Sequence, residues 1–532
     1  MTGVERLLSL SGDSGVRALL DATAATSSPP GAVAVSGLVA AVAAAVGEAG
    51  APAPAASFRR LTDRALRVAD RDTEHYWSSP PAPEATTDGP RAVAGVAAAV
   101  AALAGSTRTG NRTGNRADLE AARLLAIGAA AAAEGIAARN AKGRAGADPA
   151  PRTGRVLLAA GSVGAPPMLR AERAAECHVF DEQGRDWFDA TSGMWNVPLG
   201  HGHPEPVIGL LRQSAELAAV NPFQAGTAIA DSVADTLLRL LGRSDAFVFF
   251  GSSGSEVVEA ALRFGLAALP ADAPVWSLPS AFHGSTAGAA GLSDLPLVWG
   301  PLPAAARLPR AAPAHTWSAP GLAFVEPVRA ADRCLPLTPE TVRAVRRFQR
   351  AGGLVVVDEI AAGLGRAAWP TAGSALGLRA DITLLGKGLG NGAAPVSAMV
   401  VERRVAEKAT ASGPLDFGHT HSNHPASLGA AAACLRVLGS LDLPARTAAL
   451  DGVLGRAGIG TTGAGFLRAV HGPARSRAEV MTALRGARLL CHVPSMVTAV
   501  GQLVLAPPLT ATGAQLDDLA DRVRRVAGAL RW

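Results

Sequence analysis

Residues 247–256 read FVFFGSSGSE and lead into a helical pattern from Val257 to about Ala268. The apolar run predicts a buried strand, and the small residues after it predict a tight turn at the start of a helix. Free backbone N–H groups, serine hydroxyls and the positive end of the helix dipole meet at such a turn, so it is suited to hold a phosphate group. Turns of this kind are common, however, and Ser255 could instead be an ordinary helix N-cap.

Strand-like runs continue along the chain at residues 246–250, 322–325, 354–357 and 382–385, with helical windows between them. This alternation predicts an α/β fold with a mostly parallel sheet and helices on both faces. In such sheets ligands bind beyond the carboxyl ends of the strands. The residues that directly follow each run are therefore the first candidates for a functional site.

Two of these strand ends carry ionisable groups. Residues 354–360 read LVVVDEI, which contains the acids Asp358 and Glu359, and residues 382–392 read ITLLGKGLGNG, which contains Lys387. A carboxylate at the inner end of a sheet can hold a protonated ring nitrogen, and such a cationic partner would offset its desolvation. Lys387 stands among glycines that leave room for a bulky group, and desolvation is a usual route to a nucleophilic amine. Taken singly, Asp358 and Glu359 also fit a solvated loop, and Lys387 also fits a surface turn.

In this order the three segments resemble the class-III aminotransferases, which are fold-type I enzymes that use pyridoxal phosphate (PLP), and the resemblance runs from about residue 179 to the C-terminus. Further matching segments are DATSGMWN at 189–196, LGHGHP at 199–204, FHGS at 282–285, VEPV at 325–328, GHT at 418–420 and APPL at 506–509. The resemblance implies a mostly parallel sheet with a smaller C-terminal α+β part. It also implies a small-molecule amino donor, a carbonyl acceptor and a homodimer with shared sites.

The resemblance assigns the central chemistry to two residues. Lys387 would form a Schiff base with the cofactor and move the proton between the substrate carbon and the cofactor. Asp358 would pair with the pyridinium nitrogen, which keeps the ring an electron sink. The same two residues would serve a PLP-dependent aminomutase, racemase or decarboxylase, and these remain alternatives to transamination. A non-enzymatic assembly or scaffold protein is the alternative from a different class.

The other matching residues would hold the cofactor in place. The resemblance has the turn at 253–255 grip the phosphate, and Thr420 reach the phosphate of the neighbouring subunit's cofactor. Phe282 would stack on the ring where many members have a tyrosine, and Ile360 would cover the opposite face. The complete set expected to bind the cofactor is Ser253, Gly254, Ser255, Phe282, His283, Glu326, Asp358, Ile360, Lys387 and Thr420.

One departure from the family pattern bears on the substrate. Many members specific for amino acids carry an arginine two residues before the APPL segment, where its bidentate fork grips a carboxylate. This chain has Val504 there. We therefore expect an acceptor pocket that is apolar at Val504 and a ketone or aldehyde substrate without a nearby carboxylate, as in specialised metabolism. Arg488 or Arg468 could supply the missing cation.

Histidines cluster in residues 419–424, HTHSNH, with a spacing that could suggest a metal site. The segment coincides with the family's His-Thr loop, and no acidic or cysteine ligand adjoins it, so we expect no metal. His201 and His203 match a structural turn of the family.

A composition break at residues 140–155, NAKGRAGADPAPRTGR, predicts a linker over 141–160. Alanine-rich helical patterns before it predict an all-α domain over 1–140, and the aminotransferase-like part would be 161–532, with a large part at about 220–430 and a small part at about 161–219 plus 431–532. Residues 14–140 resemble a reduced cyclodeaminase-type helical domain of the formiminotransferase-cyclodeaminase family. Because the expected PGGGS turn reads PGAVA at 30–34, we expect a scaffold or dimerisation role rather than folate chemistry.

Composition excludes several other classes of protein. With 532 residues, 48% hydrophobic and 18% charged, the chain is neither disordered nor fibrous. The net charge of +6 comes with scattered arginines and 4% aromatics, which does not indicate nucleic-acid binding. Four cysteines without CxxC spacing indicate neither a disulfide framework nor a zinc cage. The start shows no signal-peptide pattern, and the apolar runs at 32–46 and 92–105 are shorter than the roughly 20 residues of a membrane span, so a cytoplasmic protein is expected.

Overall fold

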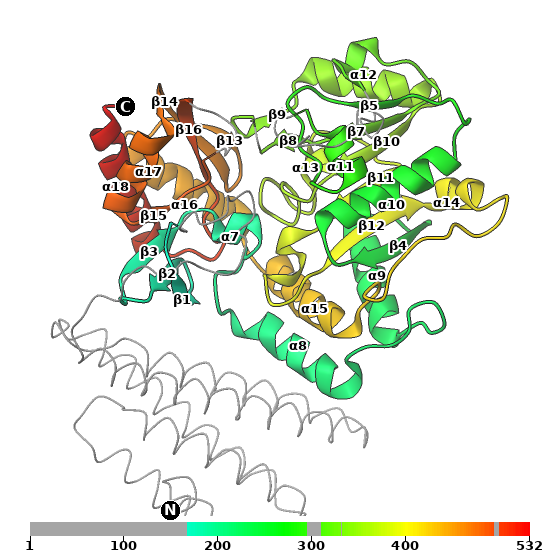
Figure 1. The fold of residues 1–532 in the computed structure, drawn as a ribbon, viewed down its shortest axis with the longest axis horizontal. Coiled ribbons are helices and arrows are strands. Elements are labelled where there is room, and N and C mark those ends of the chain that lie inside the picture. The colour runs from blue at the N-terminus through cyan, green and yellow to red at the C-terminus, as the bar shows by residue number, and fades with distance from the viewer. Residues whose placement is uncertain (1–167, 295–309, 331, 494–498) are drawn as a thin grey trace, which may run out of the picture. The chain divides into compact units, whose positions relative to one another are not determined.

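The computed structural model describes residues 168–294, 310–330, 332–493 and 499–532 (Figure 1). The chain divides into two units, and the larger one comprises residues 153–210 and 217–532. The fold and the site below belong to this larger unit. The predicted helical domain at 1–140, the linker at 141–160 and the cyclodeaminase-type resemblance lie outside the described residues.

A seven-stranded sheet forms the centre of the unit, in the order β4-β12-β11-β10-β7-β5-β6. Neighbouring strands are parallel except at β12, which is antiparallel to both β11 and β4, so the prediction of a mostly parallel sheet is confirmed. All four predicted strands are present. The strands are β4 (Ala246–Gly251), β5 (Val275–Ser277), β6 (Arg310–Ala311), β7 (Leu322–Val325), β10 (Leu354–Asp358), β11 (Ile382–Leu385) and β12 (Ser397–Glu402).

Side chains of the central strands alternate between the two faces of the sheet, as the pleat requires. On one face Phe324 and Val356 pack with the buried side of α10 (Gly254–Ala267) and with α14 (Arg403–Ala409). On the other face Val325 and Val357 pack with the apolar side of α12 (Pro339–Arg350). Helices therefore cover both faces (Figure 1), which explains why these strands read as continuous apolar runs.

Helix boundaries follow local capping chemistry. Ser253 begins α10 and Thr338 begins α12, and each side-chain oxygen accepts a hydrogen bond from an N–H group of the first turn. Two helices near the C-terminus start with capping boxes, in which Ser476 pairs with Glu479 and Thr512 with Gln515. Other helices of the described chain are α7 (Ser192–Trp195), α8 (Pro204–Leu217), α9 (Ala228–Leu241), α11 (Ala287–Leu292), η3 (Ala314–Thr316), α13 (Ala372–Ala375), η4 (Lys387–Gly390) and α15 (Pro425–Gly439).

The smaller part joins segments from both ends of the described chain. A four-stranded sheet has the order β1-β2-β3-β15 and a three-stranded sheet the order β13-β14-β16, and a short hairpin pairs β8 with β9. The elements are β1 (Ala171–Ala175), β2 (His178–Asp181), β3 (Asp186–Asp189), β8 (Val328–Arg329), β9 (Leu335–Pro336), β13 (Thr461–Ala464), β14 (Leu467–Ser476), β15 (Leu489–Leu490), β16 (Ala499–Leu505), α16 (Leu443–Arg456), α17 (Arg477–Ala487) and α18 (Gly513–Leu530).

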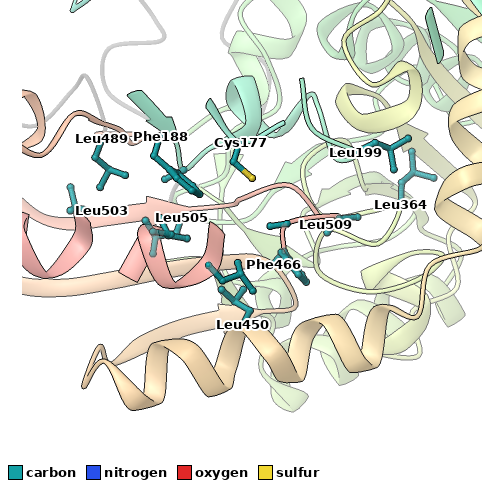
Figure 2. Packing of buried hydrophobic residues seen from close by; sticks show 14 of the residues in the cluster. Cys177, Phe188, Leu199, Leu364, Leu450, Phe466, Leu489, Leu503, Leu505 and Leu509 are labelled. Atoms are coloured by element: carbon teal, nitrogen blue, oxygen red, sulfur yellow. The ribbon is translucent and has the colours of Figure 1, made fainter. Parts of the chain in front are cut away.

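One apolar cluster binds these segments together. Phe188 on β3, Leu450 on α16 and Leu505 on β16 are all almost fully buried in it. Figure 2 shows Cys177 and Phe188 gathered with Leu489, Leu503 and Leu505, although about 300 residues separate the two groups in the chain. Burial of this shared surface fixes the segment after β3 against the segment after β16.

Among the described residues no single helix is long and apolar enough to cross a membrane. One pair, α15 and α16, reaches that length and apolar composition when the two helices are taken together, but they meet at a bend of 73°.

Candidate active site

The segments that follow β4, β10 and β11 converge at the carboxyl end of the sheet. Ile360, just after β10, connects them: a Cβ atom placed on Gly254 would lie 3.1 Å from its Cδ1, and one placed on Gly386 would lie 3.3 Å from its Cγ2. The turn before α10 and the turn that carries Lys387 therefore both pack against Ile360. The structure brings together the three segments that the sequence singled out.

The turn at the start of α10 keeps its backbone donors free. The hydroxyl of Ser253 accepts a hydrogen bond from Glu256 N at 3.3 Å, so the ordinary N-cap is Ser253 and not Ser255. Gly254 and Ser255 are the first two residues of the helix, and their N–H groups have no acceptor within it. The Ser255 hydroxyl accepts from Ser285 N at 3.1 Å, which connects this turn to the segment 282–285.

Asp358 ends β10 with a buried carboxylate that is held on both oxygens. Its Oδ1 accepts from Ile360 N at 3.1 Å, and its Oδ2 lies 2.8 Å from Nδ1 of His283. Burial alone would lower the pKa of His283, but the hydrogen bond and the charge of Asp358 outweigh it and raise this pKa above its ordinary value. The imidazole Nε2 is buried and has no hydrogen-bond partner among the described residues.

Glu326 holds the backbone of the aromatic residue that precedes His283. Its Oε2 accepts from Phe282 N at 2.9 Å, and its side chain is buried. Burial raises the pKa of Glu326 to about 7, and the charge of Asp358 adds to the increase while His283 and Lys387 oppose it. Phe282 is 39% exposed, so part of this side chain is accessible at the surface.

Lys387 is the first residue of η4 and has φ of +43°, a left-handed backbone conformation that is unfavourable for a residue with a Cβ atom. Its Nζ lies 4.5 Å from the ring centroid of Trp195. Burial lowers the pKa of the amine below its ordinary value, although Asp358 and Glu326 pull in the opposite direction. A strained, buried lysine near two carboxylates is the arrangement expected of a reactive amine.

The two acids at the end of β10, Asp358 and Glu359, have different roles, which the sequence could not distinguish. Asp358 faces His283, whereas Glu359 accepts from Ala372 N at 3.0 Å and from Gly373 N at 2.5 Å, at the start of α13. Burial raises the pKa of Glu359 to about 7. Glu359 is therefore a structural acid that fixes α13.

Trp195 and His492 lie near Lys387 and were not among the residues expected from the sequence. Their rings are 5.6 Å apart in an edge-to-face arrangement. Burial lowers the pKa of His492 to about 4, with further decreases from the charges of Lys387 and Arg477. The backbone at residues 192–195 has positive φ throughout, including three non-glycine residues. The DATSGMWN motif was a signal for Trp195, but nothing local indicated His492.

Two buried polar groups hold that left-handed turn. Asp189 accepts hydrogen bonds from Thr191 N and Gly193 N and pairs with His201 Nε2 at 2.8 Å, and the Ser192 hydroxyl donates to Ala506 O at 2.7 Å. His201 thus belongs to a structural pair. Among the described residues no group of three or more His, Cys, Asp or Glu side chains is placed to hold a metal ion.

Val504 is fully buried in an apolar cluster that includes Trp195, Cys334 and Ala469. Its surroundings are apolar, and the side chain is part of a packed wall. The two arginines considered as replacements for the missing cation are occupied elsewhere, because Arg488 pairs with Asp186 at 3.1 Å and Arg468 with Asp451 at 2.7 Å.

Thr420 lies in an exposed loop at residues 418–421. The neighbouring His419 pairs with Glu256 in the first turn of α10. The loop therefore adjoins the turn at residues 253–255 of its own chain. A Cβ atom on Gly418 would lie 3.6 Å from Phe223, whose side chain is 65% exposed. Thr420 and Phe223 thus belong to one exposed surface beside the site.

The residues present fit PLP. The free N–H groups at Gly254 and Ser255 suit a phosphate, a buried carboxylate suits a protonated ring nitrogen, and a lysine with lowered pKa suits an aldehyde. A Cβ atom at Gly251 would lie 2.7 Å from the Glu256 carboxylate, so a larger residue there would displace the acid that accepts from Ser252 N. The partly exposed Phe282 adds an aromatic side chain suited to stacking on the cofactor ring.

Comparison with known proteins shows the family to which the chain belongs. The family model described as "Aminotransferase class-III" matches residues 160–314 and 322–457. The acetylornithine aminotransferase of Mycobacterium tuberculosis is 31% identical over 379 residues, which are 66% of this chain and 90% of that protein. The omega-aminotransferase of Caulobacter vibrioides is 25% identical over 399 residues, 65% of this chain and 90% of that protein. A probable aminotransferase of M. tuberculosis, Rv3329, is 32% identical but matched over only 61% of its length.

Among solved structures, the omega transaminase of Pseudomonas jessenii in complex with PMP superimposes with a TM-score of 0.61 at 19% identity, over 69% of this chain and 94% of that one. At that identity the likeness concerns the fold. The family match covers more than half of the chain, and the acetylornithine aminotransferase is matched over nine tenths of its length. The chain therefore belongs to the class-III aminotransferases, with their fold-type I architecture and PLP-dependent transfer of an amino group to a carbonyl substrate.

Proposed function

We propose that Lys387, Asp358 and His283 carry out the amino-group transfer of this family at the carboxyl end of the central sheet. The observation that carries the assignment is a buried lysine with a lowered pKa, within electrostatic reach of a buried aspartate that is itself held by a histidine. Bound PLP supplies the aldehyde that captures the amino group and the electron-accepting ring that stabilises negative charge on the substrate carbon.

Each side chain has a defined task in this proposal. Lys387, whose buried amine has a lowered pKa and so gives up its proton more readily, holds and returns the proton at its Nζ when the substrate carbon loses and regains it. Asp358 keeps a proton on the ring nitrogen by its negative charge. His283 positions Asp358 through the 2.8 Å contact, and its raised pKa favours a cationic imidazole beside that buried carboxylate.

The remaining predicted residues would bind the cofactor. Gly254 and Ser255 would donate their free N–H groups to the phosphate, while Ser253 caps the helix. Phe282 would stack on one face of the ring, held in place by Glu326, and Ile360 would cover the other. We expect loss of the Phe282 ring to lower the affinity for the cofactor more than it lowers the rate of amino-group transfer by the loaded enzyme.

The test of the lysine uses an unusual feature of the chain, which has three lysines, Lys142, Lys387 and Lys408. Purified protein should be yellow, and borohydride should bleach the visible band and attach the cofactor irreversibly. Peptide mass spectrometry then identifies the modified lysine. Modification of Lys408, or a protein that takes up no PLP, would overturn the assignment.

Transamination is distinguished from other PLP chemistries by half-reactions. An amino donor alone should convert the pyridoxal form to the pyridoxamine form in stoichiometric amount, and a carbonyl acceptor should reverse the change. Release of carbon dioxide, loss of stereochemistry or rearrangement of the donor without this conversion would favour a decarboxylase, racemase or aminomutase at the same site.

We propose further that the acceptor lacks a carboxylate near its carbonyl group and that the enzyme serves specialised metabolism. Support comes from Val504, buried among apolar side chains, and from Arg488 and Arg468, which are already paired with acids. Burying an unpaired carboxylate against such a surface would cost several kcal/mol. A panel of donors and acceptors tests this idea: strong preference for 4-aminobutyrate, ornithine or acetylornithine over uncharged amines would overturn it.

The active unit would be a homodimer in which Thr420 reaches the phosphate site of the partner. Phe223, Met194 and Thr420 are exposed in the single chain, and we expect such a dimer to bury them. Co-expression of Lys387→Ala and Thr420→Ala chains provides the test. If Thr420 acts across the interface, mixed dimers contain one site with both native residues and regain activity. If it acts within its own chain, no site in the mixed dimer has both.

The location and the N-terminal region complete the proposal. A cytoplasmic protein is supported by four free cysteines. Residues 14–140 would form a cyclodeaminase-type helical domain that serves as a scaffold or for dimerisation. Titration of the protein with a folate should show no binding, and folate binding would contradict the scaffold role. Fractionation of the producing cell should recover the protein with the cytoplasmic contents, and export would contradict the cytoplasmic location.

A further inference from the structure

A cavity of about 440 Å³ lies beside α12, between η3 and the hairpin β8-β9. Its inner wall is apolar and includes the buried side chains of Leu278, Ala314 and Leu337. None of the residues assigned to the cofactor lines it. The volume is in the range of sites for small organic ligands.

Three arginines and one glutamate line this cavity, so it carries an excess of positive charge. Arg343 is paired with Glu340 at 2.7 Å, whereas Arg347, one turn later on the same helix, has no ion-pair partner among the described residues. Arg329 pairs with Asp332 at 2.8 Å through Nη1. Its Nε is buried and has no hydrogen-bond partner within the described ranges.

The cavity lies on the opposite side of β8 from the active site. Val328 and Ala330 belong to the buried cluster that contains Trp195 and Val504. Arg329, between them, lines the cavity instead, as the alternation of side chains along an extended segment requires. A ligand in the cavity would therefore not occupy the space beside Lys387.

We propose that this cavity binds a small organic anion. The anionic group, a carboxylate or a phosphate monoester, would pair with Arg329 and Arg347, and an apolar body would cover Leu278 and Leu337. A buried N–H group without an acceptor is unfavourable, and an anion would satisfy it with a charge-assisted hydrogen bond. The apolar wall favours an organic ligand over an inorganic ion, because burying apolar surface adds to the binding free energy.

Isothermal titration calorimetry of the PLP-loaded protein tests the proposal with benzoate, phenyl phosphate, inorganic phosphate and benzyl alcohol. We expect benzoate or phenyl phosphate to bind, and inorganic phosphate and the neutral alcohol to bind about tenfold more weakly or not at all. Arg329→Met, which keeps the length and removes the charge, should weaken binding by about tenfold or more. Arg350→Met is the matched control, because Arg350 lies on α12 outside the cavity lining.

If Arg329→Met does not fold, the exposed Arg347 provides the second variant, and Arg347→Met should reduce affinity in the same direction. The amino donor should leave the affinity of the anion unchanged, since the two sites are separate. Absence of binding, equal binding by Arg329→Met or Arg347→Met and the Arg350→Met control, or displacement of the anion by the amino donor would each overturn the proposal. None of these outcomes depends on whether Lys387 carries the catalysis.

Discussion

Nδ1 of His283 lies 2.8 Å from Oδ2 of Asp358, and both side chains are buried at the carboxyl end of the central sheet. This contact joins the segment after β5 to the end of β10, two strands away in the sheet order. The contact gives the buried carboxylate a hydrogen-bond partner, and the raised pKa of His283 favours the cationic form of that partner.

Replacing His283 by asparagine should destabilise the cofactor-free protein in a pH-dependent manner. The folded-state pKa of His283 is raised above its ordinary value of about 6.5, so its contribution is complete below that pH and is lost as pH rises through the folded value. Loss of a buried pair costs about 3 kcal/mol. Urea unfolding should therefore show a larger difference from the native protein near pH 6 than near pH 10. An equal difference at both values would contradict the charged state assigned to His283.

Lys387→Ala should abolish transamination while the protein stays folded. Because burial lowers the pKa of this amine, its charged form opposes folding, and removing it should leave the melting temperature unchanged or higher. Alanine has the same Cβ atom at φ of +43°, so it introduces no new backbone strain. Lys408→Ala, in α14, is the control and should keep full activity. Residual turnover by Lys387→Ala above the uncatalysed rate would require another base.

Phe282→Ala should weaken PLP binding by about tenfold, because the stacking surface of a ring is worth roughly 1 kcal/mol beyond the area it buries. Phe282→Tyr restores the ring and should bind PLP like the native protein. Titration of cofactor-free protein followed by the visible band measures both. Equal dissociation constants for Phe282→Ala and the native chain would show that this ring does not face the cofactor.

Val504→Arg should destabilise the protein by about 3 kcal/mol or more, since it places a charge in a fully buried apolar cluster without a partner. Val504→Met, which has a similar length and no charge, separates the effect of charge from that of size. Urea unfolding of both variants measures the difference. A Val504→Arg variant with native stability and new activity on 4-aminobutyrate would instead show that the wall opens onto the substrate pocket.

Sequence alone determined the strands and the turns that follow them. Each apolar run, such as 354–357 or 382–385, spans only a few consecutive residues. The buried strands and the glycine-rich turn around Lys387 follow from that local pattern. The order of the Gly-Ser turn, the acid pair and the lysine also carried the family resemblance. These features are encoded locally, so no knowledge of the tertiary structure was needed to find them.

Only the tertiary structure decided which side chains share the site. Asp358 and Glu359 are adjacent in sequence, yet one meets His283 and the other fixes α13, because successive residues at a strand end point in different directions. His492 reaches Trp195 across almost 300 residues, through the packing of β16 against β14 and the cluster around Val504. Such contacts depend on how distant segments bury a common apolar surface, and that pairing is a property of the whole fold rather than of any local pattern.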